Sequence, residues 1–330
     1  MNSIFKHILH NQFLVSILVV ALVYLAVELK EILAIIFISF IIMATLSPSV
    51  DFLRKNRVPK ILAVLIPYLT FIAVILLIIV PLVPFFISQL QSLFLIFPSY
   101  VDQTTKLLNL NLDISDINEM FTKDIADIGK NVLLFTSKIF TGVFSLLAVF
   151  VISFYFMLGR EKTKKEITTL FPKDSQDKVL AIISRVENKL GAWFRGQIVL
   201  SFTIGFTTWI ALTLLGIPFA PPLAILAGIL EIVPTIGPII AGIPAVIVAL
   251  SISPILAVVI IAVYIVIQML ENNILVPKIM ERAVGLNPIV IIVGVMIGTK
   301  FMGVLGALLS VPFIATLAIL FKNLKTNPTR

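Results

Sequence analysis

The sequence contains no cysteine among its 330 residues, which excludes disulfides and thiolate metal sites. Charged residues are scarce: they make up 13% of the chain, against roughly 25% in an average soluble domain. Hydrophobic residues, by contrast, make up 59%. This composition excludes an ordinary soluble domain and indicates an integral membrane protein.

Histidine is nearly absent as well: the two histidines, His7 and His10, both precede the first long apolar run. A His-x-x-x-His zinc site or a Ser–His pair within the membrane therefore cannot form. The stretch GVMIGTK at 294–300 is similar to a phosphate-binding loop, but it has three residues between its glycines and lacks the Gly-Lys pair. We therefore expect a protein that is not an enzyme and that has no cofactor, no bound metal and no nucleic-acid partner.

Eight long apolar runs are present, at about 12–29, 32–50, 61–87, 139–158, 198–216, 221–250, 254–270 and 288–321. A helix needs about 20 residues to cross a hydrocarbon core about 30 Å thick. Proline and glycine interrupt the runs 221–250 and 288–321. The pattern predicts an all-α polytopic membrane protein with about six full transmembrane helices and two broken or re-entrant helical hairpins. Eight full crossings fit the pattern equally well.

Lysine and arginine in short connections predict the orientation, because cytoplasmic loops carry the positive excess. The segments 51–60 and 160–197 have more basic than acidic residues, whereas 28–31 and 88–138 have more acidic ones. We therefore expect both termini in the cytoplasm and the protein in the cell (cytoplasmic) membrane. No small-residue cleavage site follows the first run, which favours a retained span over a cleaved signal peptide.

These features divide the chain into six expected segments. They are 1–87 (transmembrane helices 1 to 3), 88–138 (extracytoplasmic, amphipathic), 139–158 (transmembrane helix 4), 159–197 (basic, cytoplasmic and helical), 198–322 (transport core with two broken hairpins) and 323–330 (cytoplasmic tail). Apolar residues recur at helical spacing from Val179 to Trp193 among basic ones, which predicts a helix lying along the inner surface against anionic lipid. We interpret this stripe, and the one after Asp116, as packing or oligomer-contact faces.

Two charges lie well inside the apolar runs, away from their ends: Glu231 and Lys300. A charge at the centre of a membrane helix costs about 2.5 to 3.5 kcal/mol on insertion scales, so it usually faces a protein interior or a watery cavity. Both lie in broken segments, where proline frees backbone carbonyls to bind protein, water or a solute. Such a pair of segments predicts a transport site. Lys300 fits the exposed tip of a hairpin equally well, and Glu231 could instead have a structural partner. Whether 237–245 and 303–315 form an internal repeat also stays open.

The candidate substrate- or ion-pathway residues all lie in or between these broken segments. They are Glu231, Pro234, Thr235, Gly237, Pro238, Gln268, Glu271, Asn272, Asn273, Pro277, Asn287, Lys300, Gly303, Gly306 and Pro312. For Glu271 and the asparagines after it, two interpretations stay open: they line the mouth of a cavity, or they cap a helix at the surface. We assign no catalytic residue.

Four stretches together resemble the autoinducer-2 exporter family, also called PerM-like permeases. They are GRE to GQ (159–197), LLGIPFAPPLAILAGILEIVPTIGPIIAGIPA (214–245), ENNILVPKIM (271–280) and GLNPIVIIVGVMIGTKFMGVLGALLSVPFIA (285–315). The resemblance covers essentially the whole chain and is strongest from about 190 to 320. The family carries Tyr or a related residue where this chain has Thr235, and commonly His where it has Asn287.

The resemblance implies a multi-pass exporter with broken hairpins that assembles as a homo-oligomer, a pentamer in members of known form. Some members export the autoinducer-2 signal, and some are similar to sodium or lithium/proton antiporters. We therefore expect a secondary exporter of a small polar solute, with membrane lipids and the solute or a coupling cation as partners. A sodium(lithium)/proton antiporter is the alternative, and a membrane scaffold that does not transport is a further one.

Overall fold

The computed structural model describes residues 27–77, 132–233, 236–280 and 287–325, together with isolated residues between 16 and 25 and at 99 and 103. Every regular element in these ranges is a helix. The predicted all-α class is thus confirmed for the described part of the chain. The first apolar run, the outside segment 88–138 and the tail 323–330 lie mostly outside it.

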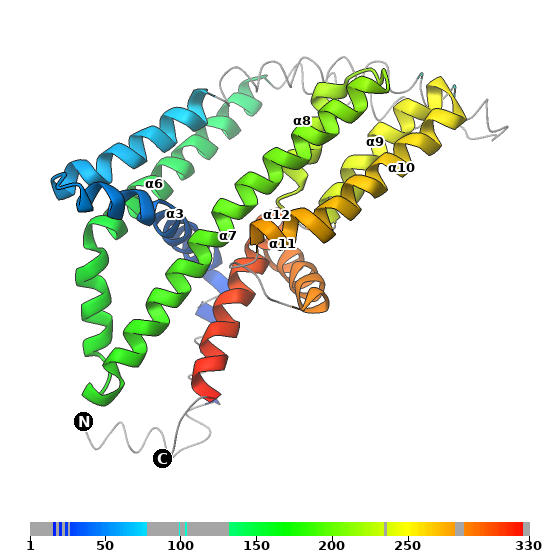
Figure 1. Cartoon of the computed structure of the whole chain (residues 1–330). Coiled ribbons are helices and arrows are strands. Elements are labelled where there is room, and N and C mark those ends of the chain that lie inside the picture. The colour runs from blue at the N-terminus through cyan, green and yellow to red at the C-terminus, as the bar shows by residue number, and fades with distance from the viewer. Residues whose placement is uncertain are drawn as a thin grey trace.

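The helices fall into two groups on either side of one long helix (Figure 1). Before it come α3 (Lys30–Lys55), a helix at Lys60–Leu77 and α6 (Val132–Thr169), and the long helix is α7 (Lys173–Leu214). After it come α8 (Ala220–Leu230), α9 (Ile236–Ile252), α10 (Pro254–Leu270), the π-helix η1 (Glu271–Leu275), α11 (Val276–Met280) and α12 (Pro288–Lys325). Within the described ranges, five helical stretches are long and apolar enough to cross a membrane. These spans confirm a multi-pass membrane protein.

The long helix α7 differs from the expected division of the chain. Its 42 residues extend about 63 Å at about 1.5 Å per residue. The basic stretch predicted to lie along the inner surface is the first half of this helix, and the expected boundary at 197 falls inside it. The physical reason is packing: Leu190 and Trp193 are buried in a core with α3, α10 and α12 rather than turned to lipid. The stripe is therefore a packing face, as interpreted from its spacing.

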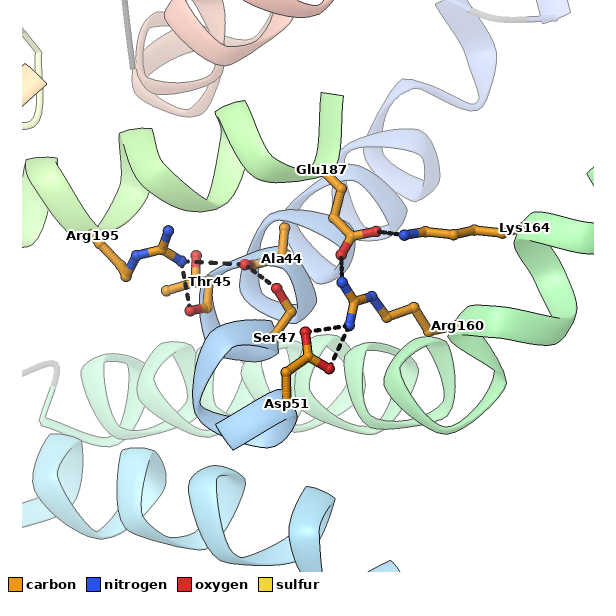
Figure 2. A network of polar contacts seen from close by, with 8 residues as sticks. All are labelled: Ala44, Thr45, Ser47, Asp51, Arg160, Lys164, Glu187 and Arg195. Atoms are coloured by element: carbon orange, nitrogen blue, oxygen red, sulfur yellow. Dashed lines mark hydrogen bonds and ion pairs between the residues drawn. The ribbon is translucent and has the colours of Figure 1, made fainter. Parts of the chain in front are cut away.

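A proline in α3 creates the joint between α3 and α7. Pro48 lacks an N–H, so the Ala44 carbonyl one turn earlier loses its helical donor. Two side chains supply donors instead. Ser47 Oγ donates to the Ala44 carbonyl oxygen at 2.9 Å, and Arg195 Nη1 of α7 donates to the carbonyl oxygens of Ala44 at 3.3 Å and Thr45 at 2.9 Å (Figure 2). The carbonyl oxygen that Pro48 leaves without its helical donor in α3 thus also accepts a hydrogen bond from α7.

Four charged residues form a second connection near this joint, which we call the polar clamp: Asp51 of α3, Arg160 and Lys164 of α6, and Glu187 of α7. Arg160 Nη1 donates to both Asp51 carboxylate oxygens at 2.9 Å, and its Nη2 pairs with Glu187 (Figure 2). Lys164 Nζ lies 2.7 Å from the other Glu187 oxygen. Burial by itself lowers the pKa of Arg160, but its hydrogen bonds to Asp51 and Glu187 outweigh burial and raise it, so the cation is retained. The clamp fastens three helices.

We predict that Gly191→Ala weakens the joint between α3 and α7. A Cβ at position 191 would overlap the Ala44 carbonyl oxygen, so the helices would have to separate. We expect a loss of about 1 to 3 kcal/mol, as for other overpacked contacts, measured as thermal unfolding in mild detergent. Gly159→Ala is the matched control, because its Cβ would meet only Thr163 Oγ1 at 3.4 Å. Equal stability of both variants would show that the close approach is not required.

We predict that Glu187→Gln destabilises the protein by about 3 kcal/mol, because removing one partner of a buried ion pair leaves uncompensated charge. Glu187 is 1% exposed, and Lys164 has no other acid within the clamp. Glu166→Gln is the control: Glu166 forms an exposed pair with Lys162, and such pairs contribute about 0 to 1 kcal/mol. Chemical or thermal unfolding of both variants measures the difference, and similar curves would contradict the assignment of the clamp.

Candidate functional site

The first broken region folds as a helical hairpin. The arm α8 has 11 residues and rises about 16 Å, and α9, with 17 residues, rises about 26 Å. Both arms are shorter than the about 20 residues that a helix needs to cross a hydrocarbon core about 30 Å thick. The two arms meet closely because Gly237 lies against the Leu230 carbonyl, where any Cβ would overlap it. The turn that follows α8 begins at Glu231.

Glu231 is the first residue of this turn and is fully buried, at 0% exposure. Its backbone is held from α7, because Gln197 Nε2 donates to the Glu231 carbonyl oxygen at 2.8 Å. Within the described part of the chain, neither carboxylate oxygen of Glu231 has a hydrogen-bond partner. The fold thus fixes the backbone of this residue and leaves its buried acid group unsatisfied.

The acid group of Glu231 faces a second one, from Glu271. Glu271 is 3% exposed and begins the π-helix η1, where α10 widens by one residue per turn. Its Oε2 accepts a hydrogen bond from Gln268 Nε2 at 3.0 Å. The carboxyl groups of Glu231 and Glu271 are near enough to interact electrostatically, and they share a hydrogen bond only when one of them carries a proton, since two carboxylates have no donor. We call these two groups the carboxyl pair.

The carboxyl pair requires something further to be stable. Two buried carboxylates in contact repel each other, and neither forms an ion pair with a basic residue of the described ranges. Two hydroxyl groups, Ser201 Oγ and Tyr264 Oη, are also buried without a partner there. Tyr264 lies on the face of α10 that carries Gln268 and then Glu271, at spacings of four and three residues. The carboxyl pair therefore needs a proton, a cation or a further hydrogen-bond donor.

The second broken region is also a hairpin, which turns inside α12. Met302 and Gly303 leave the helical conformation, and Gly303, at φ 59° and ψ −141°, has a backbone geometry that is accessible mainly to glycine. The two arms run antiparallel, since Ser310 Oγ donates to the Gly294 carbonyl at 2.9 Å. Lys300 lies exposed beside the turn, and Lys30 Nζ of α3 donates to the Phe301 carbonyl at 3.3 Å. Of the two interpretations of Lys300, the structure supports the hairpin tip.

The structure thus brings together three of the sequence-predicted site residues, Glu231, Gln268 and Glu271, with Gly237 shaping the turn. The other predicted residues lie elsewhere or have structural contacts. Three of them are exposed: Asn272, Asn273 and Pro277. Asn287 caps the start of α12 through the Ile289 N–H, Gly306 packs against Gly298, Pro312 is buried in an arm of α12, and Pro238 is partly buried in α9. Two more, Pro234 and Thr235, lie outside the described residues. Sequence reasoning missed Gln197, whose one signal is a lone amide at the start of the apolar run 198–216.

Comparison with known proteins adds to this geometry. The chain matches the model of the AI-2E family transporter over residues 13–326. It is 27% identical to YueF of Bacillus subtilis over 84% of this chain and 80% of that protein. It is likewise 27% identical to YrrI of the same organism over 88% and 86%. Both are named as transport proteins without a stated solute. A stretch covering 40% of this chain and 39% of the relative is 31% identical to TqsA of Escherichia coli, named as an AI-2 transport protein.

We predict that the turn of α12 faces the outside of the cell, on the side of Lys30, and that the α6–α7 turn faces the cytoplasm. The absence of cysteine makes single-cysteine variants unambiguous probes. Lys300→Cys should react with a membrane-impermeant maleimide added to intact cells. Leu170→Cys, 81% exposed in the α6–α7 turn, should react only after permeabilisation. The reverse labelling pattern would overturn the orientation inferred from the basic loops.

Proposed function

Because this chain belongs to the AI-2E family of transporters, we propose that it is a secondary exporter of a small polar solute, such as the autoinducer-2 signal. The observation that carries the proposal is the buried, unsatisfied carboxyl group of Glu231 at the tip of a helical hairpin. An unsatisfied polar group in a water-poor interior costs several kcal/mol. A transported ligand that contacts this group offsets the cost during each cycle.

The chemistry of the site favours a small solute with hydroxyl groups. The Glu231 carboxyl group accepts hydrogen bonds, while the Ser201 and Tyr264 hydroxyls both donate and accept them. The similarity to TqsA, which is named as an AI-2 transport protein, supports a signal of this class. The sequence contains no phosphate-binding loop, so the energy comes from an ion or solute gradient.

A sodium(lithium)/proton antiporter is the second candidate, and the carboxyl pair is the observation that favours it. Two acids without a basic partner in the described ranges suit a small cation or a proton as well as a solute. The candidates differ in one measurable respect: an antiporter moves cations and protons when no organic solute is present. A scaffold that does not transport accounts for the helices but gives no role to the destabilising Glu231.

We further propose that the protein forms a homo-oligomer, pentameric as the family resemblance implies, in the cell membrane with lipids as partners.

We predict that Glu231→Gln and Pro234→Ala both reduce efflux of autoinducer-2 from proteoliposomes. Loss of a charge-assisted hydrogen bond of about 1.5 to 3 kcal/mol corresponds to a decrease of roughly tenfold or more for Glu231→Gln. Pro234→Ala supplies the backbone N–H that proline lacks, which favours a continuous helix, and should therefore reduce efflux. Glu166→Gln, at the exposed end of α6, is the control and should transport as the parent does. Correctly inserted variants with parental efflux would remove Glu231 and Pro234 from the site.

A further inference from the structure

We propose that Glu231 and Glu271 hold one proton between them, Glu231 as the acid and Glu271 as the carboxylate, and that this shared proton couples transport to the proton gradient. The coupling role rests on the proposed function. The shared proton itself rests on the geometry of the described residues alone.

Glu187 is another buried acid of the same chain, and its surroundings differ from those of Glu231. Glu187 is 1% exposed and is paired with both Arg160 and Lys164. Glu231 is 0% exposed and has no basic partner in the described ranges. Burial of an isolated carboxylate is far costlier than burial of a carboxylic acid. Two basic side chains therefore compensate Glu187, whereas Glu231 needs a proton.

The residues around the carboxyl pair include no basic partner in the described part of the chain. Besides Glu271, the elements packed on the turn contribute Gln197 from α7 and Gln268 and Tyr264 from α10. The arms α8 and α9 contain no titratable residue. Arg195, the nearest basic residue along α7, is bonded to carbonyls of α3. Charge compensation at the pair thus comes from a proton rather than from a basic side chain.

The hydrogen bonds around the carboxyl pair indicate that Glu231 is the member that carries the proton. Glu271 accepts a hydrogen bond from Gln268, and a donor of this kind stabilises the charged form of a carboxyl group. Glu231 accepts no such bond in the described part of the chain, because Gln197 donates to its backbone carbonyl instead. Glu231 therefore carries the O–H and donates it to the carboxylate of Glu271.

The shared proton is linked to transport by the solute. A solute with two or more hydroxyl groups donates hydrogen bonds to both carboxyl groups and so stabilises their charged forms. Glu231 then releases its proton to water on one side of the membrane and becomes a carboxylate. When the solute leaves on the other side, water returns one proton to Glu231 and the pair re-forms. One proton therefore moves in the direction opposite to each solute molecule.

Infrared spectroscopy of the reconstituted protein at neutral pH in D2O tests the shared proton directly, through the C=O stretching band of a protonated carboxyl group. We expect one such band in the parent. It should vanish in Glu231→Gln, which removes the acid, and shift in Glu271→Gln, which removes only the acceptor. It should persist in Glu187→Gln, which removes a buried acid paired with two basic residues, and in the exposed control Glu166→Gln. A parent without the band, or a band that survives Glu231→Gln, overturns the proposal.

Two further measurements separate this proposal from the proposed function. Proteoliposomes that contain a trapped pH dye and a gradient of autoinducer-2 should show one proton entering for each signal molecule that leaves, and Glu231→Gln should abolish the proton movement. Signal efflux without proton movement overturns the coupling but leaves the exporter intact. If the infrared band is present but no signal molecule leaves, the proposal that the protein is an exporter is wrong, whereas the shared proton stands. If the band is lost when sodium chloride replaces choline chloride, the carboxyl pair binds sodium, and the proposal of a shared proton is wrong.

Discussion

The need to compensate every buried charge and every freed backbone group governs this structure, since a lipid-embedded interior offers little water to do so. At the polar clamp the compensation is complete: Glu187 has two bases and Arg160 has two acids. At the first hairpin it is incomplete, because Glu231 has only another acid to face. One protein thus contains a charge cluster that stabilises it and one that requires a further partner.

The helix α7 connects these two places. Along one continuous helix it carries Glu187 in the clamp, Gly191 and Arg195 at the joint with α3, and Gln197 at the hairpin. Toward its C-terminus it packs closely along the hairpin arm α8, where Gly205 lies against Gly228, and Gln197 donates to the Glu231 carbonyl oxygen. One helix thus supports both the polar clamp and the first hairpin.

The two hairpins have the same architecture but different turns. The stretches 237–245 and 303–315, which resemble each other loosely in sequence, each begin at or just after a turn and form the start of a second arm. Small residues let the arms approach at both, through Gly237 in the first and through Gly298 and Gly306 in the second. The first turn buries an acid, and the second exposes a lysine beside it. The same form therefore places a buried acid at one turn and an exposed lysine at the other.

The sequence by itself determined the all-helical membrane class, the two breaks and the importance of Glu231, because run length, proline and an isolated charge act locally. It did not determine that α7 is unbroken past residue 197, since its apolar stripe fits lipid and α3 equally well. Nor did it choose between a tip and a site for Lys300, or single out Gln197. Only the tertiary structure paired Glu231 with Glu271, 40 positions away on another helix, because packing rather than spacing brings such groups together.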